Sequence, residues 1–361
     1  MLRVGIIGCG KIADGHVEQI RAIDRGEVVA VCDREPLMAE QLATRFGIPA
    51  RYTELAAMLE RERLDVLHVA TPPDSHRAIA EHAFAAGCHL FVEKPFALCA
   101  ADTERILDAA VQANRKLAVN YLYNFESPAL LLEDYLRAGR LGDIVHLETL
   151  YGYSLSGDYG LAVLADPKHW VHRLPGRLFH NVLDHVLAKV ARFVDDDFRL
   201  TVVSARRRAA TGDRIVDAMD DELRFLIASP ATAVTVSGMI SAHARPVTHM
   251  LRIFGSKDSY ELDFAARTIT PLARQVYPSA LGRLLMPFSQ ARGYRRNGWR
   301  NAGAFRRHEF HYFQCMRVLL ARFYDAIELD APVPIAAADI LRVSRLIDAL
   351  VAGVEAQKAT A

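Results

Sequence analysis

Leu2-Arg3-Val4-Gly5-Ile6-Ile7-Gly8-Cys9-Gly10-Lys11-Ile12-Ala13 is the stretch that decides the fold. Its apolar part, residues 2–8, predicts a buried parallel strand, and a helix is expected over roughly residues 13–24. Gly8 allows a tight turn, Gly10 lets the backbone approach a pyrophosphate, and Ala13 is small enough for close helix–strand packing. Because the N-terminal amides of such a helix point at phosphates, the stretch is typical of a dinucleotide-binding turn.

An acidic residue follows the second strand of this pattern. The strand expected over residues 28–32 ends at Asp33, 20 residues after Ala13. A carboxylate there can accept hydrogen bonds from the adenosine ribose hydroxyls and repels a 2′-phosphate, so it favours NAD over NADP. Arg34 is a complication, because a guanidinium can neutralise a 2′-phosphate. The alternative for Asp33 is a helix N-cap before Pro36.

Strands and helices continue to alternate after this point. The periodicity predicts helices over residues 53–63 and 76–87 and strands over 64–70 and 88–92, with a turn over 71–76. Short links between alternating elements predict a doubly wound parallel sheet. The turns with candidate functional residues follow the carboxyl ends of strands, which is the edge where ligands bind in such sheets.

The composition is that of a two-domain globular protein. The chain has 361 residues, of which 51% are hydrophobic and 24% charged, and its net charge is +1 at pH 7. So small a charge gives no support to nucleic-acid binding. The apolar runs are broken by charges and no signal peptide is recognisable, so we expect a cytoplasmic protein without a spanning helix. Free thiols and no metal site are expected, because the five cysteines are scattered: Cys9, Cys32, Cys88, Cys99 and Cys315.

Further motifs resemble the Gfo/Idh/MocA family of sugar and inositol oxidoreductases. They are Thr71-Pro72-Pro73 with His76, and Ala86-Gly87 leading to Glu93-Lys94-Pro95. The likeness is close over residues 2–145 and looser through 254–262. It implies a Rossmann domain and then an α+β domain with an open, mostly antiparallel sheet that covers the nicotinamide. The sheet's other face often forms the oligomer interface in this family, so a homodimer or homotetramer is expected.

The expected domains are the NAD(P)-binding Rossmann domain (1–122), the substrate and oligomerisation domain (123–335), and a C-terminal helix (336–355) that packs back on the Rossmann domain. Strand-like alternation in the second domain agrees with the implied sheet. The candidate strands are 144–153, 198–207, 221–229, 232–242, 248–254, 258–264 and 267–272.

The family resemblance places Lys94 beside the nicotinamide and the reacting hydroxyl. Oxidation of a secondary alcohol needs a base for the hydroxyl proton, and a nearby cation stabilises a developing alkoxide. A lysine beside the positive ring would have its proton affinity lowered. The alternative is an exposed loop lysine. The residues expected at the cofactor are Gly8, Gly10, Lys11, Ile12, Asp33, Arg34, Thr71, Pro72, His76, Glu93, Lys94 and Asn120.

A helix-like stretch over residues 177–185 carries the other catalytic candidates. In the family, this helix has an acidic residue or Asn and, four residues on, a histidine facing the substrate. Asn181 and His185 match that spacing. His185 is our candidate general base, and Asn181 would orient substrate or imidazole. The chain departs from the family at Asn181, where many members have Asp, and at Ala188, where Asp is frequent. A shifted register would pair His180 with Asp184 instead. The residues expected at the substrate are Tyr121, Tyr123, Trp170, Asn181 and Asp184, although packing between domains explains the two tyrosines equally well.

Residues 264–308 contain no acidic residue. Nine arginines lie there, interleaved with apolar residues such as Leu284, Phe288 and Trp299; they are Arg267, Arg274, Arg283, Arg292, Arg295, Arg296, Arg300, Arg306 and Arg307. The segment suits a solvated basic helix pair packed on its own domain or on a neighbouring subunit, which we prefer. An anionic membrane surface or an acidic substrate such as a nucleotide sugar is the alternative.

The sequence therefore predicts an NAD(P)-dependent oxidoreductase that transfers hydride between nicotinamide and a secondary alcohol of a sugar, nucleotide sugar or polyol. NAD is favoured over NADP. One alternative is an NAD-dependent glycoside hydrolase that works by transient oxidation and elimination. Another is a non-catalytic dinucleotide-binding sensor, which would need neither Lys94 nor His185.

Overall fold

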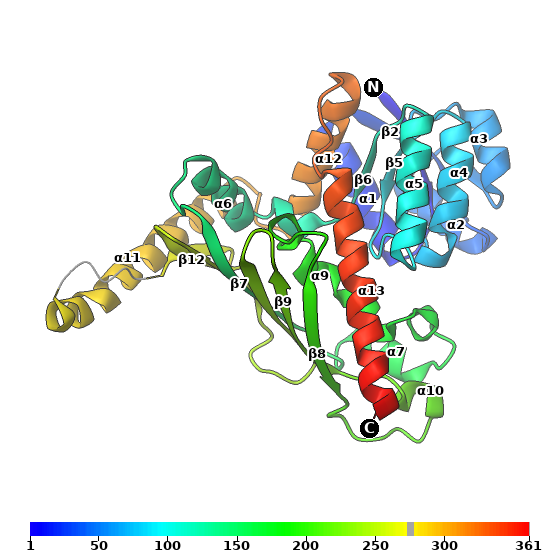
Figure 1. Cartoon of the computed structure of the whole chain (residues 1–361). Coiled ribbons are helices and arrows are strands. Elements are labelled where there is room, and N and C mark those ends of the chain that lie inside the picture. The colour runs from blue at the N-terminus through cyan, green and yellow to red at the C-terminus, as the bar shows by residue number, and fades with distance from the viewer. Residues whose placement is uncertain (273–277, 361) are drawn as a thin grey trace. The chain divides into compact units, whose positions relative to one another are not determined.

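The computed structural model describes residues 1–272 and 278–360 (Figure 1). Contacts divide the chain into a first unit, Met1–Leu122 with Tyr312–Arg345, and a second unit, Tyr123–His311 with Leu346–Ala361. The division after Leu122 falls where the sequence places the end of the cofactor domain.

The rest of the division differs from the expected domains. Residues 312–335, expected in the substrate domain, belong to the first unit. Helix α13 (Ala337–Thr360) is shared, because its part up to Arg345 belongs to the first unit and its remainder to the second. The C-terminal helix therefore packs on the cofactor domain only at its beginning, where Ser344 Oγ lies 2.7 Å from Thr103 Oγ1.

The first unit is built on a six-stranded, fully parallel sheet of order β3-β2-β1-β4-β5-β6. Its strands are β1 (Leu2–Ile7), β2 (Gly26–Cys32), β3 (Ala50–Tyr52), β4 (Val66–Val69), β5 (His89–Val92) and β6 (Leu117–Val119). Its helices are α1 (Lys11–Ile23), α2 (Pro36–Phe46), α3 (Leu55–Glu62), α4 (His76–Ala85), α5 (Ala100–Gln112) and α12 (Gln314–Glu328). The strand order reverses between β1 and β4, which is where such sheets bind ligands.

Helix α12 completes the core of the first unit. It packs on α1, and its Phe323 and Tyr324 side chains are fully buried. On α1, Ala13, Val17 and Ile20 are also fully buried, at the spacing of one helix face. Burial of each large apolar side chain contributes about 1.5–3 kcal/mol, so residues far along the chain stabilise the N-terminal domain.

The second unit contains a seven-stranded sheet of order β13-β12-β11-β7-β10-β9-β8. All seven predicted strands are confirmed, with bounds within two residues: β7 (Ile144–Gly152), β8 (Arg199–Ala205), β9 (Glu222–Ser229), β10 (Val234–Ser241), β11 (His249–Gly255), β12 (Ser259–Asp263) and β13 (Thr268–Pro271). The β7–β10 pair is parallel and the other pairs are antiparallel. The predicted open, mostly antiparallel sheet is therefore confirmed.

The described helices of the second unit, besides its part of α13, are α6 (Ser127–Arg137), α7 (Asp158–Ala165), α8 (Arg177–Val182), α9 (Asp184–Leu187), α10 (Arg214–Asp217) and α11 (Ser279–Arg306). The stretch over residues 177–185, expected as one helix, forms α8 and α9. Leu183 between them keeps helical backbone angles (φ −61°, ψ −32°). Within the described residues, no helix has the length and apolar character needed to span a bilayer.

Candidate functional site

The turn between β1 and α1 is shaped by two glycines with different roles. Gly8 has a positive φ of 91°, and a Cβ on it would lie 2.6 Å from the carbonyl carbon and oxygen of Ala70. Gly10 has no described atom within 4 Å of its Cβ position. Gly8 is thus required by the fold itself, whereas Gly10 leaves open space of the kind a pyrophosphate needs.

We expect Gly8→Ala and Gly10→Ala to separate folding from cofactor binding. The first should destabilise the protein by about 1–3 kcal/mol or more, because it strains the backbone and collides with Ala70 directly after β4. The second should leave the melting temperature unchanged and lower NADH affinity, because its methyl group meets only the space left for the cofactor. Thermal denaturation and NADH titration measure the two effects, and a Gly10→Ala protein with parental NADH affinity would contradict the expectation.

Asp33 is held in place at the end of β2. Its Oδ2 accepts a hydrogen bond from the backbone amide of Cys9 (2.8 Å), and its Oδ1 accepts one from the amide of Glu35 (2.9 Å). The N-cap of α2 is Glu35, so Asp33 is not the capping residue that the sequence left as its alternative. The carboxylate is joined to the glycine turn and is half-buried, while Arg34 is exposed.

His76 joins two of the turns at the carboxyl edge of the sheet. Its Nε2 lies 2.8 Å from the carbonyl of Thr71, and its Nδ1 lies 2.9 Å from the carbonyl of Phe96. Burial lowers its pKa. Both ring nitrogens lie within hydrogen-bond distance of backbone carbonyls, and the neutral ring donates to one of them, so we expect His76 to position the turn that contains Thr71 and Pro72.

A buried polar cluster is centred on Glu93, the residue before Lys94. Glu93 Oε1 accepts hydrogen bonds from Asn120 Nδ2 (2.6 Å) and pairs with His16 Nε2 (2.9 Å). Burial opposes ionisation of Glu93, but the hydrogen bonds from His16 and Asn120 outweigh it and hold the pKa of Glu93 below its usual value. Asn120 Oδ1 is buried and has no hydrogen-bond partner among the described residues. That oxygen is available to a donor from a bound molecule.

The cluster continues as a chain of hydrogen bonds away from Glu93. His16 Nδ1 lies 2.8 Å from His68 Nδ1, and His68 Nε2 lies 3.0 Å from the hydroxyl of Tyr324 on α12. Burial and the neighbouring His16 lower the pKa of His68, which is therefore neutral. An ionised Glu93 only accepts, so His16 Nε2 carries a proton. The neutral His68 carries one ring proton, so it donates to only one of its two neighbours, His16 or the Tyr324 hydroxyl.

The second unit places several predicted site residues against aromatic side chains. The His185 ring lies edge-on to Tyr123, with ring centroids 5.1 Å apart, and 4.8 Å from the ring of Tyr151. Asn181 is buried, and its Nδ2 donates to the hydroxyl of Tyr159 (3.4 Å). Asp184 is buried on the same stretch. Tyr121, also buried, belongs to the first unit, so the two predicted tyrosines fall on different units.

Trp170 connects to Asn181 through aromatic contacts. Its ring stacks on His169 at 5.7 Å, and His169 in turn lies edge-on to Tyr159 at 5.5 Å. Burial and the neighbouring Tyr153 raise the pKa of Tyr159, so this hydroxyl stays neutral. Trp170 is therefore linked through His169 and Tyr159 to Asn181, and its substrate contact stays a prediction.

A buried lysine–histidine pair was not foreseen from the sequence. Lys189 Nζ lies 2.6 Å from His249 Nε2, and both side chains are buried. Burial lowers the pKa of Lys189 well below its ordinary value; burial and the neighbouring Lys189 and His185 do the same for His249. His249 also hydrogen-bonds to the backbone of His185. Asn181, His185 and Lys189 recur every four residues, and this spacing is the signal that could have pointed to Lys189.

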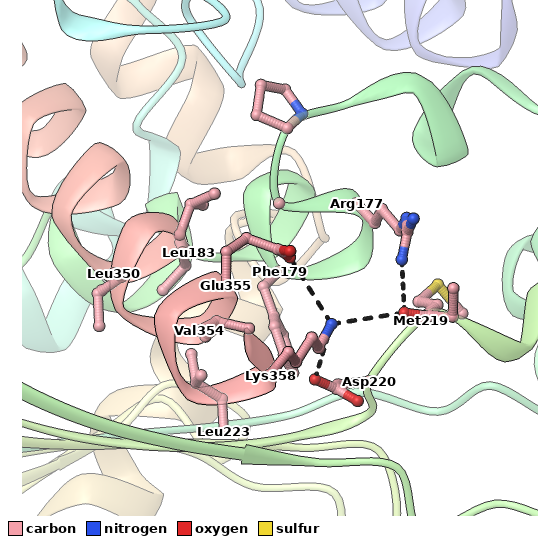
Figure 2. A pocket seen from close by; sticks show the side chains of 14 residues that line it. Arg177, Phe179, Leu183, Met219, Asp220, Leu223, Leu350, Val354, Glu355 and Lys358 are labelled. Atoms are coloured by element: carbon pink, nitrogen blue, oxygen red, sulfur yellow. Dashed lines mark hydrogen bonds and ion pairs between the residues drawn. The ribbon is translucent and has the colours of Figure 1, made fainter. Parts of the chain in front are cut away.

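The second unit also has a pocket on another side of α8 (Figure 2). Phe179 and Leu183 line it with Leu223 and the last turns of α13. Lys358 Nζ pairs with Asp220 (3.1 Å) and lies 3.5 Å from the carbonyl of Ala218 at this pocket (Figure 2). None of the predicted site residues lines it. Lys358 pairs with Asp220 and Glu355, and the Arg177 guanidinium donates to the carbonyl of Ala218.

The parallel sheet and its glycine turn define a dinucleotide-binding Rossmann domain. Residues 2–121 match the GFO_IDH_MocA model, described as an oxidoreductase family with an NAD-binding Rossmann fold. The resemblance drawn from the motifs is therefore confirmed for this part of the chain.

The curated relatives match the chain over its N-terminal part. D-apiose dehydrogenase of Paraburkholderia graminis is 35% identical over 137 residues, which are 38% of this chain and 36% of the relative. A glycosyl hydrolase family 109 protein of Shewanella pealeana is 30% identical over 163 residues, 43% of this chain and 36% of the relative. The chain thus spans little more than a third of the length of either relative.

The likeness to solved structures extends over the whole chain. Levoglucosan dehydrogenase, solved in complex with NADH and levoglucosan, is similar with a TM-score of 0.77 and 21% identity. The match covers 99% of this chain and 98% of that chain. At this identity the likeness shows a shared fold for both units.

Proposed function

We propose that the protein is an NAD-dependent oxidoreductase that transfers hydride between nicotinamide and a secondary alcohol of a sugar, nucleotide sugar or polyol. The observation that carries the proposal is the Gly8–Gly10 turn with Asp33 bonded to it, at the point where the strand order of the sheet reverses. The carboxylate of Asp33 favours a free ribose 2′-hydroxyl and so NAD. A cytoplasmic homodimer or homotetramer is part of the same proposal.

The proposed roles follow from the positions of the polar groups. Asp33 would hold the adenosine ribose, and Asn120 Oδ1 would accept a hydrogen bond from the nicotinamide carboxamide. NAD, when bound, supplies the hydride acceptor. Lys94 would act on the hydroxyl proton and stabilise the developing alkoxide. His185 is proposed as the general base of the second unit, with Asn181 orienting the substrate.

The deciding experiment follows absorbance of reduced nicotinamide with NAD and NADP offered separately. The panel holds free sugars, inositols, nucleotide sugars and simple glycosides. We expect turnover with NAD and a much weaker signal with NADP. Equal turnover with both cofactors would remove the role proposed for Asp33; NADH binding without turnover of any substrate would favour the sensor.

Hydrolysis through transient oxidation is the second candidate, favoured by the likeness to a glycosyl hydrolase family 109 protein. The same cofactor and Lys94 would serve, but the cofactor would return to its starting state. Cleavage of a glycoside without net accumulation of NADH would establish this activity in place of the dehydrogenase.

A further inference from the structure

Helix α11 packs on the sheet with one side only. The buried Asn297 side chain donates to the carbonyl of Ile269 in β13 (2.9 Å). A Cβ added to Gly293 would lie 3.6 Å from the Thr270 side chain, so the helix also approaches β13 there. Figure 1 shows α11 running out past the β12–β13 end of the sheet. Most of its first half is exposed. The helix therefore presents a long side that the described residues of its own unit leave open.

The open side carries a row of large apolar side chains. Leu281, Leu284, Leu285 and Phe288 recur every three or four residues, share one helix side, and are all exposed. Phe288 is 69% exposed. Phe288 precedes Asn297 by about two and a half turns, and both residues follow Pro287, so they point in opposite directions. Isolated exposed apolar side chains are ordinary, but three leucines and a phenylalanine along one helix side mark a contact surface.

Arginines surround this row without acidic partners. Residues 264–308 contain no Asp or Glu. Arg292 and Arg295 follow Phe288 on the same side, and neither forms an ion pair within residues 1–272 and 278–360. Trp299, 71% exposed, continues the row toward the C-terminal end. Arg274 belongs to the same basic segment of sequence but lies outside the described residues.

We propose that the open side of α11 docks on an anionic lipid bilayer. Leucine and phenylalanine would enter the boundary between headgroups and acyl chains, tryptophan would lie at the interface, and arginines would pair with acidic headgroups. A second copy of the chain is a poorer occupant, because like helices would bring arginine against arginine with no acidic side chain to pair. Nucleic acid would pair with the arginines but leave the leucines and Phe288 uncovered.

Flotation of the full chain with vesicles tests the docking. Vesicles of phosphatidylcholine with phosphatidylglycerol should carry the protein upward, and vesicles of phosphatidylcholine alone should not. The double variant Leu284→Ser with Phe288→Ser should lose at least tenfold in bound fraction, as should Arg292→Gln with Arg295→Gln. Leu37→Ser, which changes an exposed leucine on α2, is the matched control and should float like the parent.

Tryptophan fluorescence and the stability of the variants complete the test. The emission of Trp299 should shift to the blue on anionic vesicles, and Trp299→Phe should abolish the shift. Thermal denaturation and NADH binding of all variants should match the parent, because the changed residues are exposed. A parent that stays unbound on anionic vesicles overturns the proposal. A second result would also overturn it. If the parent does not float and the Leu284→Ser, Phe288→Ser variant has a lower sedimenting mass than the parent, this side of α11 binds a second copy of the chain.

Discussion

Replacement of Lys94 by alanine is expected to lower kcat by roughly 10²–10⁴-fold, the range typical of a lost general acid or base. The half-buried side chain follows β5 at the edge where the glycine turn and Asp33 lie. NADH affinity should change little, because Asp33 and the glycine turn supply most of the cofactor contacts in our proposal. Single-turnover hydride transfer, measured with a substrate from the panel, separates the chemical step from binding.

Lys116→Ala is the matched control for this experiment. Lys116 precedes β6 at the opposite edge of the same sheet and pairs with Asp330 (2.8 Å). Its loss should leave hydride transfer at the parental rate. If Lys94→Ala retained the parental kcat, the lysine would be only a loop residue, and the acid–base role would pass to the second unit.

Replacement of Lys189 by methionine is expected to abolish a rise in stability with pH that the parent shows below the ordinary lysine pKa. Burial lowers the pKa of Lys189 well below 10.5, so the unfolded chain binds a proton that the folded chain lacks. Stability of the parent therefore rises with pH, by about 1.4 kcal/mol per unit, from the folded pKa up to that of the unfolded chain. Methionine fills similar space without a proton, so the variant should lack this rise.

The measurement is equilibrium denaturation of both proteins between pH 7 and the ordinary lysine pKa of 10.5. Loss of the hydrogen bond to His249 lowers the stability of the variant by about 1–3 kcal/mol at every pH and does not affect the slope. Lys358→Met removes a lysine that is ion-paired at the protein surface, and it should keep the parental slope. A Lys189→Met protein with the parental slope would mean that Lys189 stays charged in the folded state.

Much of the fold could be predicted because its signals are local. The strand–glycine–helix stretch at Gly8 and the alternating strands of the second unit depend on residues close together in sequence. The parallel β7–β10 pair could not be predicted, since strand pairing depends on packing between distant residues. The sequence placed α12 in the second domain for the same reason, because an apolar pattern predicts a buried helix face but not the helix against which it packs.

The candidate site residues came from the family resemblance, where a motif or its spacing carries information. The resemblance proposed Lys94 through the Glu93-Lys94-Pro95 motif and proposed Asn181 and His185 through their spacing of four, and their roles stay predictions. The chain from Glu93 to Tyr324 was not foreseen, because His16, His68 and Tyr324 lie in three separate elements. His249, 60 residues from its lysine partner, had no signal beyond an otherwise ordinary strand.

The hydrogen bond between His68 in β4 and Tyr324 in α12 also constrains the order in which the first unit folds. Synthesis runs from the N-terminus, so the six strands of the first sheet leave the ribosome long before α12. Until residue 324 emerges, His68 lacks its hydroxyl partner, and the face of α1 that α12 covers remains open. A nascent chain that ends before α12 would therefore expose apolar surface of the kind chaperones recognise, and the cofactor domain reaches its final packing only after the second sheet has been made.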